Sequence, residues 1–335
     1  MKRRLILIFL PKQLDIQDYI KGLQDSNIAV LSRAITLIES TKPEHQALAS
    51  QLIDTILPLT GKSIRIGITG VPGVGKSTFI ESFGMYCINE GKKVAVLAID
   101  PSSSLSKGSI LGDKTRMEQL SVHPNAFIRP SAASGSLGGV TYKTREATLL
   151  CEAAGFDTII IETVGVGQSE TEVSQITDFF LLLMLAGAGD ELQGIKRGIM
   201  EMADGLIITK ADGNNVTKAK SARTEYARAL HFLPPQPSGW IPEVLVCSSY
   251  ENSGIQEVVQ MIEKFVQHQN INGFFQQKRK EQNHHAFQRL LQEYLRRFFL
   301  LKPDIKETIN KLESAVVSGE TSPYSAVQQL AAFIQ

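Results

Sequence analysis

The chain carries at residues 70–77 the stretch Gly70-Val71-Pro72-Gly73-Val74-Gly75-Lys76-Ser77, which we call the phosphate loop. The stretch matches the pattern G-x-x-x-x-G-K-[ST], in which glycines allow a tight turn that aims consecutive N–H groups at phosphate oxygens. The apolar segment 63–69 before it predicts a short buried strand, and the segment 77–89 after it predicts a helix. Strand, glycine loop and helix form the context that the pattern requires, so we expect a nucleoside triphosphate to bind here.

The phosphate loop also predicts roles for single residues. Lys76 is expected to reach the β- and γ-phosphates, and the Ser77 hydroxyl is expected to bind Mg²⁺. The N-terminus of the following helix adds partial positive charge, which favours an anion. The predicted nucleotide-binding residues of this region are Gly70, Val71, Pro72, Gly73, Val74, Gly75, Lys76, Ser77 and Thr78.

Length and composition describe an ordinary globular protein. The 335 residues suit one large domain with appendages or two domains, and 43% of them are hydrophobic and 21% charged. The net charge of +1 creates no strong field for nucleic acid or an anionic membrane, so we expect neither as a partner. No segment supplies the run of about 18 apolar residues that a membrane span needs.

The cysteines and the N-terminus bear on location. Cys87, Cys151 and Cys247 are far apart and form neither a metal-binding spacing nor a disulfide framework, which favours a reducing cytoplasm. The basic start followed by the apolar run 5–10 is similar to the beginning of a signal peptide, but the run is short and no small-residue cleavage site follows. A short strand, a helix end or a misassigned start codon fits these residues better than a targeting signal does.

The pattern of apolar residues divides the chain into three regions. Residues 1–60 form a helical N-terminal segment, because apolar residues recur every three to four positions and Pro43 is suited to start its second helix. Residues 61–268 alternate between short apolar stretches and helical stretches, which predicts an α/β domain with a mostly parallel sheet covered by helices on both faces. The predicted strands are 64–69, 94–99, 127–129, 158–161, 179–185, 205–209 and 244–247, and helices at 77–89, 142–154 and 216–231 fall between them.

The alternation stops in the last region, residues 269–335. A long helix is expected over 274–300, followed by two shorter helices before and after Ser322-Pro323. Because this arm has too little apolar content to fold alone, we expect it to pack on the main domain or on a second copy of itself.

A second motif, Thr209-Lys210-Ala211-Asp212, follows one of the predicted strands and resembles the guanine-reading N-K-x-D element. The Asp212 carboxylate can accept hydrogen bonds from guanine N1–H and the exocyclic amine, a pair of donors that adenine lacks. The stem of Lys210 can lie over the base plane, and Thr209 stands where asparagine is usual. After the last strand, Cys247-Ser248-Ser249 occupies the place of a loop whose backbone contacts guanine. The predicted base-binding residues are Lys210, Asp212, Cys247, Ser248 and Ser249.

Acidic residues at two further strand ends predict Mg²⁺ chemistry. Glu162 begins Glu162-Thr163-Val164-Gly165, in the place of the γ-phosphate-sensing D-x-x-G element, and suits Mg²⁺ contact through water. Gly165 can offer its N–H to the γ-phosphate. Asp100 is a second candidate for Mg²⁺ or for positioning water, with a simple Asp-Pro turn as its alternative. The predicted metal ligands are Ser77, Asp100 and Glu162, and the predicted catalytic residues are Lys76, Asp100, Glu162 and Gly165.

Together, these motifs resemble the MeaB/ArgK-type GTPases, the G-protein chaperones of adenosylcobalamin-dependent acyl-CoA mutases. The resemblance covers roughly residues 30–270, and its specific runs are 67–78, 98–103, 111–117, 161–170 and 188–196. It implies a P-loop GTPase core of the metallochaperone and signal-recognition class and a C-terminal arm that forms a homodimer. It further implies nucleotide-sensing switches at 100–117, 163–170 and 188–197, loops that otherwise could be plain surface loops.

The same resemblance implies a function. Such proteins bind methylmalonyl-CoA mutase or a related mutase, and use GTP binding and Mg²⁺-dependent hydrolysis to GDP to gate cofactor loading and protect the mutase. Thr209 and Thr141-Tyr142 depart from the family pattern. Two alternatives stay open: a small-molecule kinase, which needs an acceptor-binding constellation, and a metal-delivery GTPase, which needs cysteine and histidine near the switches. Cys151 is isolated, however, and His284-His285 lie on the predicted tail helix.

Overall fold

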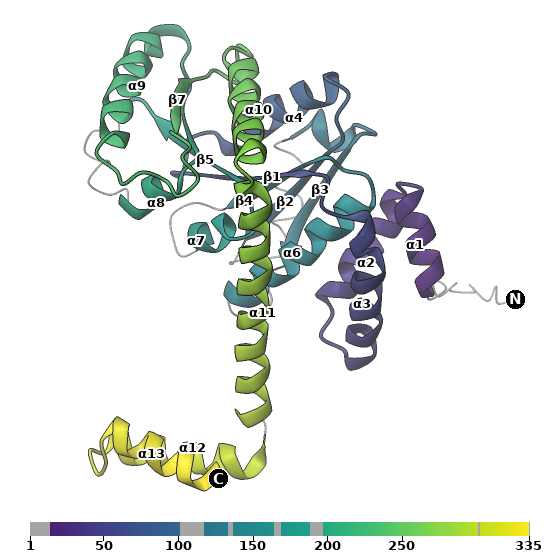
Figure 1. Ribbon diagram of the computed structural model, residues 1–335, viewed down its shortest axis with the longest axis vertical. Coiled ribbons are helices and arrows are strands. Elements are labelled where there is room, and N and C mark those ends of the chain that lie inside the picture. The colour runs from purple at the N-terminus through teal and green to yellow at the C-terminus, as the bar shows by residue number, and fades with distance from the viewer. Residues whose placement is uncertain are drawn as a thin grey trace, which may run out of the picture. The chain divides into compact units, whose positions relative to one another are not determined.

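The computed structural model describes residues 14–100, 117–132, 137–163, 169–187, 197–300 and 302–334. At its centre lies a seven-stranded sheet with the order β3-β2-β4-β1-β5-β6-β7, in which every pairing is parallel (Figure 1). All the strands predicted from the sequence are present. They are β1 (Ile64–Gly70), β2 (Val94–Asp100), β3 (Ala126–Ala132), β4 (Thr158–Thr163), β5 (Phe179–Leu185), β6 (Gly205–Thr209) and β7 (Glu243–Val246).

The β3 strand is longer than its apolar stretch predicts. It continues beyond Arg129 through Pro130, which lies opposite Ala98 of β2. Proline lacks an N–H and is tolerated at the edge of a sheet, and β3 is an edge strand. Backbone pairing with β2 therefore extends the strand where side-chain pattern alone ends it.

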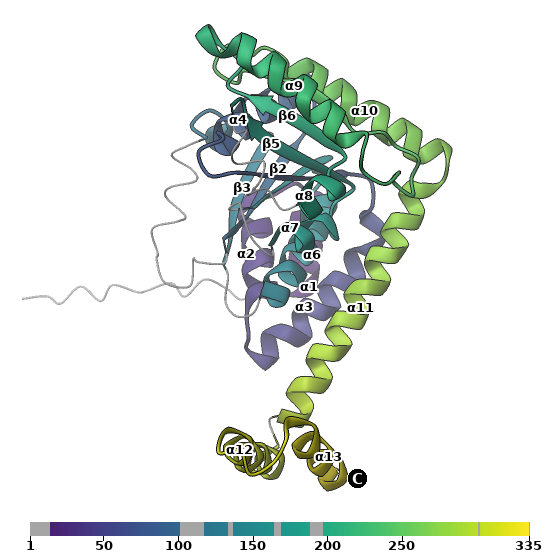
Figure 2. The ribbon, with the colours of Figure 1, turned by 90° about the vertical axis from the view of Figure 1, so that its left-hand side faces the viewer.

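Helices cover both faces of the sheet, as Figure 2 shows for α10 and α6. Val94 and Val96 of β2 belong to the core beneath α4 and α10, whereas Ala95 and Leu97 belong to the core beneath α6. Alternate residues of a strand point to opposite faces, so a strand between two helical layers must be apolar throughout. The helices of the domain are α4 (Lys76–Asn89), α6 (Leu137–Ala153), α7 (Ser169–Ser174), α8 (Arg197–Met202), α9 (Val216–Leu230) and α10 (Ile255–Ile271).

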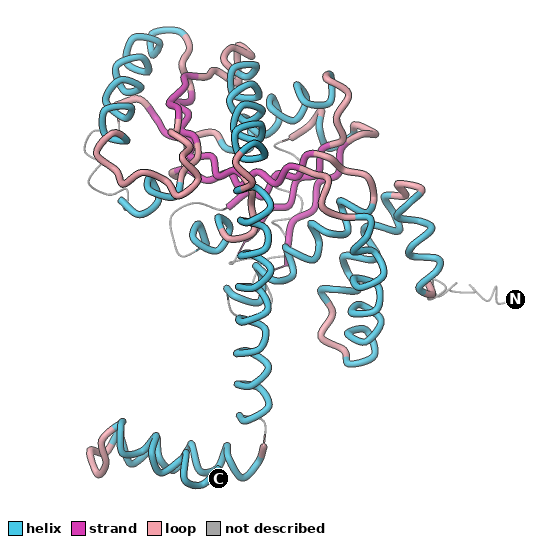
Figure 3. Tube along the Cα trace, viewed as in Figure 1, coloured by secondary structure: helices cyan, strands magenta, loops and turns pink. Residues whose placement is uncertain are grey.

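The N-terminal segment contains three helices where the apolar spacing predicts two: α1 (Ile16–Gln24), α2 (Ile28–Glu39) and α3 (Pro43–Ile56), coloured cyan with the other helices in Figure 3. The additional break lies at Ser26, whose φ of 54° is left-handed. The Asn27 side chain then caps α2 by accepting hydrogen bonds from the N–H groups of Ala29 and Val30. Side chains of these helices share one core with the sheet, and the proposed boundary at residue 60 stays a prediction.

A buried ion pair fixes the start of β1 against α6. The Glu152 carboxylate accepts hydrogen bonds from Arg65 Nε and Nη2, each at 3.0 Å. It also accepts from the Ser63 hydroxyl at 2.6 Å and from the Gly61 N–H at 2.9 Å. A buried carboxylate with this many donors is well compensated for its loss of water, so these contacts fasten the start of β1 to α6.

The chain divides into two compact units, one up to Lys278 and one from Arg279. The second unit contains most of α11 (Phe274–Leu300), together with α12 (Pro303–Val317) and α13 (Pro323–Ile334), in agreement with the predicted long helix and two shorter ones. Ile305 of α12 and Ala326 of α13 are buried where these helices pack together. Within the described ranges, no helix combines the length and apolar character needed to cross a bilayer.

Candidate nucleotide-binding site

The predicted motifs meet at one edge of the sheet because all their strands run in the same direction. The phosphate loop follows β1, Glu162 lies at the end of β4, and Thr209 ends β6. Since β1 lies between β4 and β5, the chain changes direction across the sheet at this strand. In open parallel sheets such a switch point opens a crevice at the carboxyl ends, where ligands bind.

The glycines of the phosphate loop are required by its backbone. Gly73 and Gly75 have φ values of 77° and 93°, in the left-handed region that favours glycine. A Cβ at Gly70 would lie 2.6 Å from the carbonyl oxygen of Leu183, so only glycine fits beside β5. Val74 is completely buried and anchors the loop in the core. The residue types therefore permit this conformation, which other side chains at Gly70, Gly73 and Gly75 would oppose.

Lys76 lies at the start of α4 with its ammonium group over the loop. Its Nζ donates a hydrogen bond to the Gly70 carbonyl at 2.9 Å. Burial lowers the pKa of Lys76, while the carboxylates of Glu162 and Glu170 raise it. The ammonium group is therefore hydrogen-bonded to a carbonyl of the loop itself and lies within the electrostatic influence of two carboxylates.

The donor set beside Lys76 fits Mg²⁺. Ser77 supplies a hydroxyl from the first turn of α4, and Glu162 supplies a buried carboxylate from β4. The neighbouring Thr163 hydroxyl donates to Thr69 Oγ1 at 2.8 Å, which joins the ends of β4 and β1. Oxygen donors of this kind suit a hard cation that shares its coordination with phosphates and water. A group of three or more histidines, cysteines or acidic residues able to hold a metal by itself is not found in the described part of the chain.

The remaining catalytic predictions are only partly covered by the structure. Asp100 ends β2 at the same edge, and its side chain lies outside the described residues. Gly165 and most of the predicted switches at 100–117, 163–170 and 188–197 also lie outside them. The roles of these residues stay predictions.

A base loop, residues 209–212, is joined to the loop after β7. The Ser248 hydroxyl donates to Asp212 Oδ2 at 2.6 Å and accepts a hydrogen bond from the Glu251 N–H at 3.1 Å. The Ala211 N–H donates to the Cys247 carbonyl at 3.0 Å. These contacts fix the direction of the Asp212 carboxylate and leave its other oxygen for a ligand's donors.

Lys210 extends from the base loop to the phosphate loop. Its φ of 55° is left-handed, and the Asn215 side-chain amide supports this conformation by donating to the Lys210 carbonyl at 2.7 Å. Lys210 Nζ donates to the Gly73 carbonyl at 2.7 Å. The stem therefore spans the space between the two loops, as expected of a side chain that covers the base plane.

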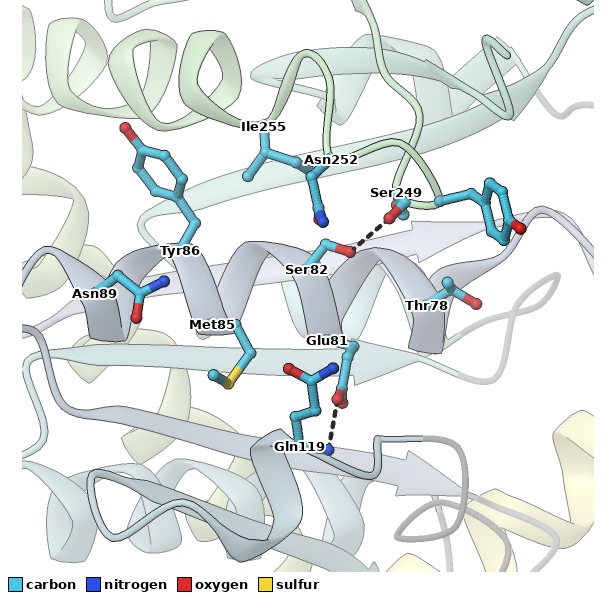
Figure 4. A pocket seen from close by; sticks show the side chains of 11 residues that line it. Thr78, Glu81, Ser82, Met85, Tyr86, Asn89, Gln119, Ser249, Asn252 and Ile255 are labelled. Atoms are coloured by element: carbon cyan, nitrogen blue, oxygen red, sulfur yellow. Dashed lines mark hydrogen bonds between the residues drawn. The ribbon is translucent and has the colours of Figure 1, made fainter. Parts of the chain in front are cut away.

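Ser249 and Thr78 line a groove of about 540 Å³ along α4, shown in Figure 4. The Ser82 hydroxyl donates to the Ser249 carbonyl at 3.0 Å, which holds the loop after β7 against α4. On the other wall, the Gln119 N–H donates to Glu81 Oε1 at 2.7 Å. The predicted base-binding loop after β7 is thus fixed to the same helix whose N-terminus follows the phosphate loop.

Sequence reasoning missed two features of this site. Glu170 of α7 is 1% exposed and acts electrostatically on Lys76, whereas the sequence assigned it only a place in the predicted switch 163–170. Ser248 was predicted to contribute its backbone, whereas its hydroxyl also orients Asp212. The signal for Glu170 was its place after the predicted γ-phosphate-sensing element, and the signal for Ser248 was a hydroxyl directly after a buried strand.

Comparisons with known proteins agree with this geometry. A family model described as methylmalonyl Co-A mutase-associated GTPase MeaB matches residues 31–303. GTPase ArgK of Escherichia coli strain K12 is 47% identical over 320 residues, which is 96% of this chain and 97% of that protein. The mitochondrial methylmalonic aciduria type A homolog of Mus musculus is 46% identical and aligns with 92% of this chain and 77% of its own length.

A solved structure extends the likeness to three dimensions. The crystal structure of a LAO/AO transport system kinase superposes with a TM-score of 0.78 at 41% identity, covering 96% of this chain and 97% of that one. A shared P-loop fold alone does not require a family model to match residues 31–303. It also does not require 47% identity to a relative over 320 residues. The chain therefore belongs to the MeaB family and is a GTPase.

Proposed function

We propose that this GTPase is a chaperone of an adenosylcobalamin-dependent acyl-CoA mutase of the methylmalonyl-CoA mutase type, gating cofactor loading and protecting the mutase. The observation that carries the proposal is its membership of a family described as mutase-associated, together with a site in which phosphate and base loops are joined. A site joined in this way lets the bound nucleotide bias the surrounding loops, which is what a GTP-dependent gate needs.

In this proposal the chain's own residues bind and orient GTP. The amides of the phosphate loop face the phosphates. The Lys76 side chain turns away from the Gly70 carbonyl, and its ammonium group then donates to the β- and γ-phosphates. Asp212, held by Ser248, accepts from the guanine donors. Positioning and charge stabilisation of this kind supply most of the catalysis in phosphoryl transfer to water.

Ser77 and Glu162 would hold Mg²⁺, with Asp100 as a further ligand or water-positioning residue. The cation, when bound with the nucleotide, supplies positive charge to the phosphate oxygens. Gly165 completes the proposed set by offering its N–H to the γ-phosphate. GTP, GDP and Mg²⁺ are therefore the proposed ligands.

The mutase role is tested by mixing the purified chain with the adenosylcobalamin-dependent acyl-CoA mutases encoded in the same genome. We expect one of them to co-elute with the chain, with an affinity that differs between GDP and a non-hydrolysable GTP analogue, and to change GTP turnover several-fold. A mutase without adenosylcobalamin dependence serves as the control. Absence of a complex in both nucleotide states, with turnover unchanged, would refute the role.

We also propose a homodimer formed through the C-terminal unit. The α11 stripe, defined as Phe287, Leu291, Tyr294 and Phe298, is exposed by 60%, 38%, 64% and 49%. Its spacing of four, three and four residues is that of a seam between two packed helices. A second copy presenting the same stripe would cover it.

Replacing Phe287 and Tyr294 together by serine in the full chain should convert a dimer to a monomer. The reason is that these two aromatic rings are the most exposed members of the α11 stripe. Light scattering after size exclusion measures the mass. The matched control replaces His285 and Arg296, exposed residues on another side of α11, by serine and should leave the dimer intact. A wild-type monomer at high concentration would contradict the proposal.

A small-molecule kinase is the second candidate, because one similar solved structure is that of a LAO/AO transport system kinase. The two functions differ in where the γ-phosphate goes. With γ-labelled GTP, the chaperone proposal expects the label in inorganic phosphate whether or not an amino acid is present. Label on an added basic amino acid would favour the kinase.

We place the protein in the cytoplasm. Cys87, Cys151 and Cys247 are buried and free, and burial raises the pKa of Cys87 to about 12 and that of Cys247 to about 11. Thiols with raised pKa values react slowly with oxidants, which fits structural cysteines in a reducing compartment. Fluorescent-fusion imaging or cell fractionation tests the location, and recovery with membranes would contradict it.

A further inference from the structure

Two consecutive side chains of the base loop hold two consecutive carbonyls of the phosphate loop. Lys210 Nζ donates to the Gly73 carbonyl at 2.7 Å, and the Thr209 hydroxyl lies 2.8 Å from the Val74 carbonyl. Thr209 is 3% exposed and Val74 is fully buried, so water does not replace the contact between them, whereas Lys210 and Gly73 are exposed. The threonine thus contacts the phosphate loop from beneath, within the core.

The contact with Val74 determines the direction of the next amide. A trans peptide is planar, and its C=O and N–H groups point in opposite directions. Holding the Val74 carbonyl toward Thr209 therefore turns the Gly75 N–H toward the opposite side, where the phosphates are expected. Gly75 has a φ of 93°, and glycine has no Cβ to hold that conformation by itself.

The hydroxyl has a choice of acceptors. Its oxygen lies 2.8 Å from the Val74 carbonyl and 3.2 Å from the Met184 carbonyl of β5, and a hydroxyl has one hydrogen to donate. The shorter distance favours Val74. Asparagine, the usual residue in the N-K-x-D element, has two donor hydrogens and could satisfy both carbonyls. Thr209 can donate to only one of them at a time.

We infer that Thr209 is a positioning residue for phosphate binding, which fixes the Val74–Gly75 peptide through its hydroxyl and so presents the Gly75 N–H to the nucleotide. This inference rests on the proposed binding of GTP and GDP. According to this inference, Thr209 strengthens binding of the nucleotide's phosphates and does not contribute to recognition of the base.

The test compares Thr209→Val, which removes the hydroxyl at nearly constant shape, with Thr209→Ser, which retains it. Affinities for GDP and IDP are measured by competition with a fluorescent GDP analogue, because IDP lacks the guanine amine that Asp212 reads. We expect Thr209→Val to bind both nucleotides about ten-fold more weakly, since a buried carbonyl loses its donor. The ratio of the two affinities should not change, and Thr209→Ser should return both to within about three-fold of wild type.

Each other outcome overturns the inference. A Thr209→Val protein that binds GDP like wild type, or shows only a lower melting temperature, would mean that the contact is merely structural. A changed GDP-to-IDP ratio would place the effect on the base, and failure of Thr209→Ser to restore binding would exclude the hydroxyl. If Thr209→Val does not fold, Thr209→Cys takes its place: its weaker donor should give an intermediate loss, and wild-type affinity would overturn the inference. Wild-type protein that binds no GDP would instead refute the proposed function.

Discussion

Asp212→Asn should lower the affinity for GTP about a hundred-fold and raise the affinity for XTP. Asp212 Oδ2 accepts the Ser248 hydroxyl at 2.6 Å, which leaves the rest of the carboxylate for the two guanine donors. The amide replaces one acceptor by a donor, so a guanine N–H faces another N–H, at a cost of about 2.7 kcal/mol. Xanthine carries a carbonyl in place of the guanine amine and can accept from that donor.

Competition with a fluorescent GDP analogue measures both nucleotides on the same protein. Glu251→Gln is the matched control, because it makes the same chemical change on an exposed side chain in the adjoining loop. This variant should bind GTP like wild type. Unchanged GTP affinity in Asp212→Asn, or equal binding of ATP and GTP by the wild type, would rule out the guanine-reading role of Asp212.

Lys76→Ala should reduce GTP turnover about a thousand-fold. The Lys76 ammonium donates to the Gly70 carbonyl and is subject to the carboxylates of Glu162 and Glu170, so it is poised beside the phosphates. Removing a preorganised cation that stabilises charge in the transition state costs about 4 kcal/mol. Release of inorganic phosphate at saturating GTP and Mg²⁺ measures the loss in kcat.

Lys92→Ala serves as the control for Lys76→Ala, since Lys92 is exposed just beyond the end of α4. Its turnover should equal that of the wild type. A loss smaller than about ten-fold in Lys76→Ala would show that the phosphate loop acts without its lysine, contrary to the proposed chemistry.

The accuracy of the sequence prediction differs between parts of the fold. The strands could be located because each is a short apolar stretch between helices, and a strand buried on both faces has no other pattern. The N-terminal helices were less predictable, since Ser26 adopts a left-handed conformation within a continuous apolar spacing. Their packing on the sheet, and not a local signal, determines where that break lies.

The sequence by itself determined the phosphate loop and the family, and it predicted the residues that would face a guanine nucleotide. Such motifs are local: Gly73 and Gly75 must be glycine for the backbone to turn, whatever surrounds them. Only the tertiary structure decided how the motifs are joined. Thr209 lies 135 residues from Val74, and Ser248 lies 36 residues from Asp212. These pairs meet because parallel strand order brings distant loops to one edge of the sheet, a property of the whole fold that no local pattern contains.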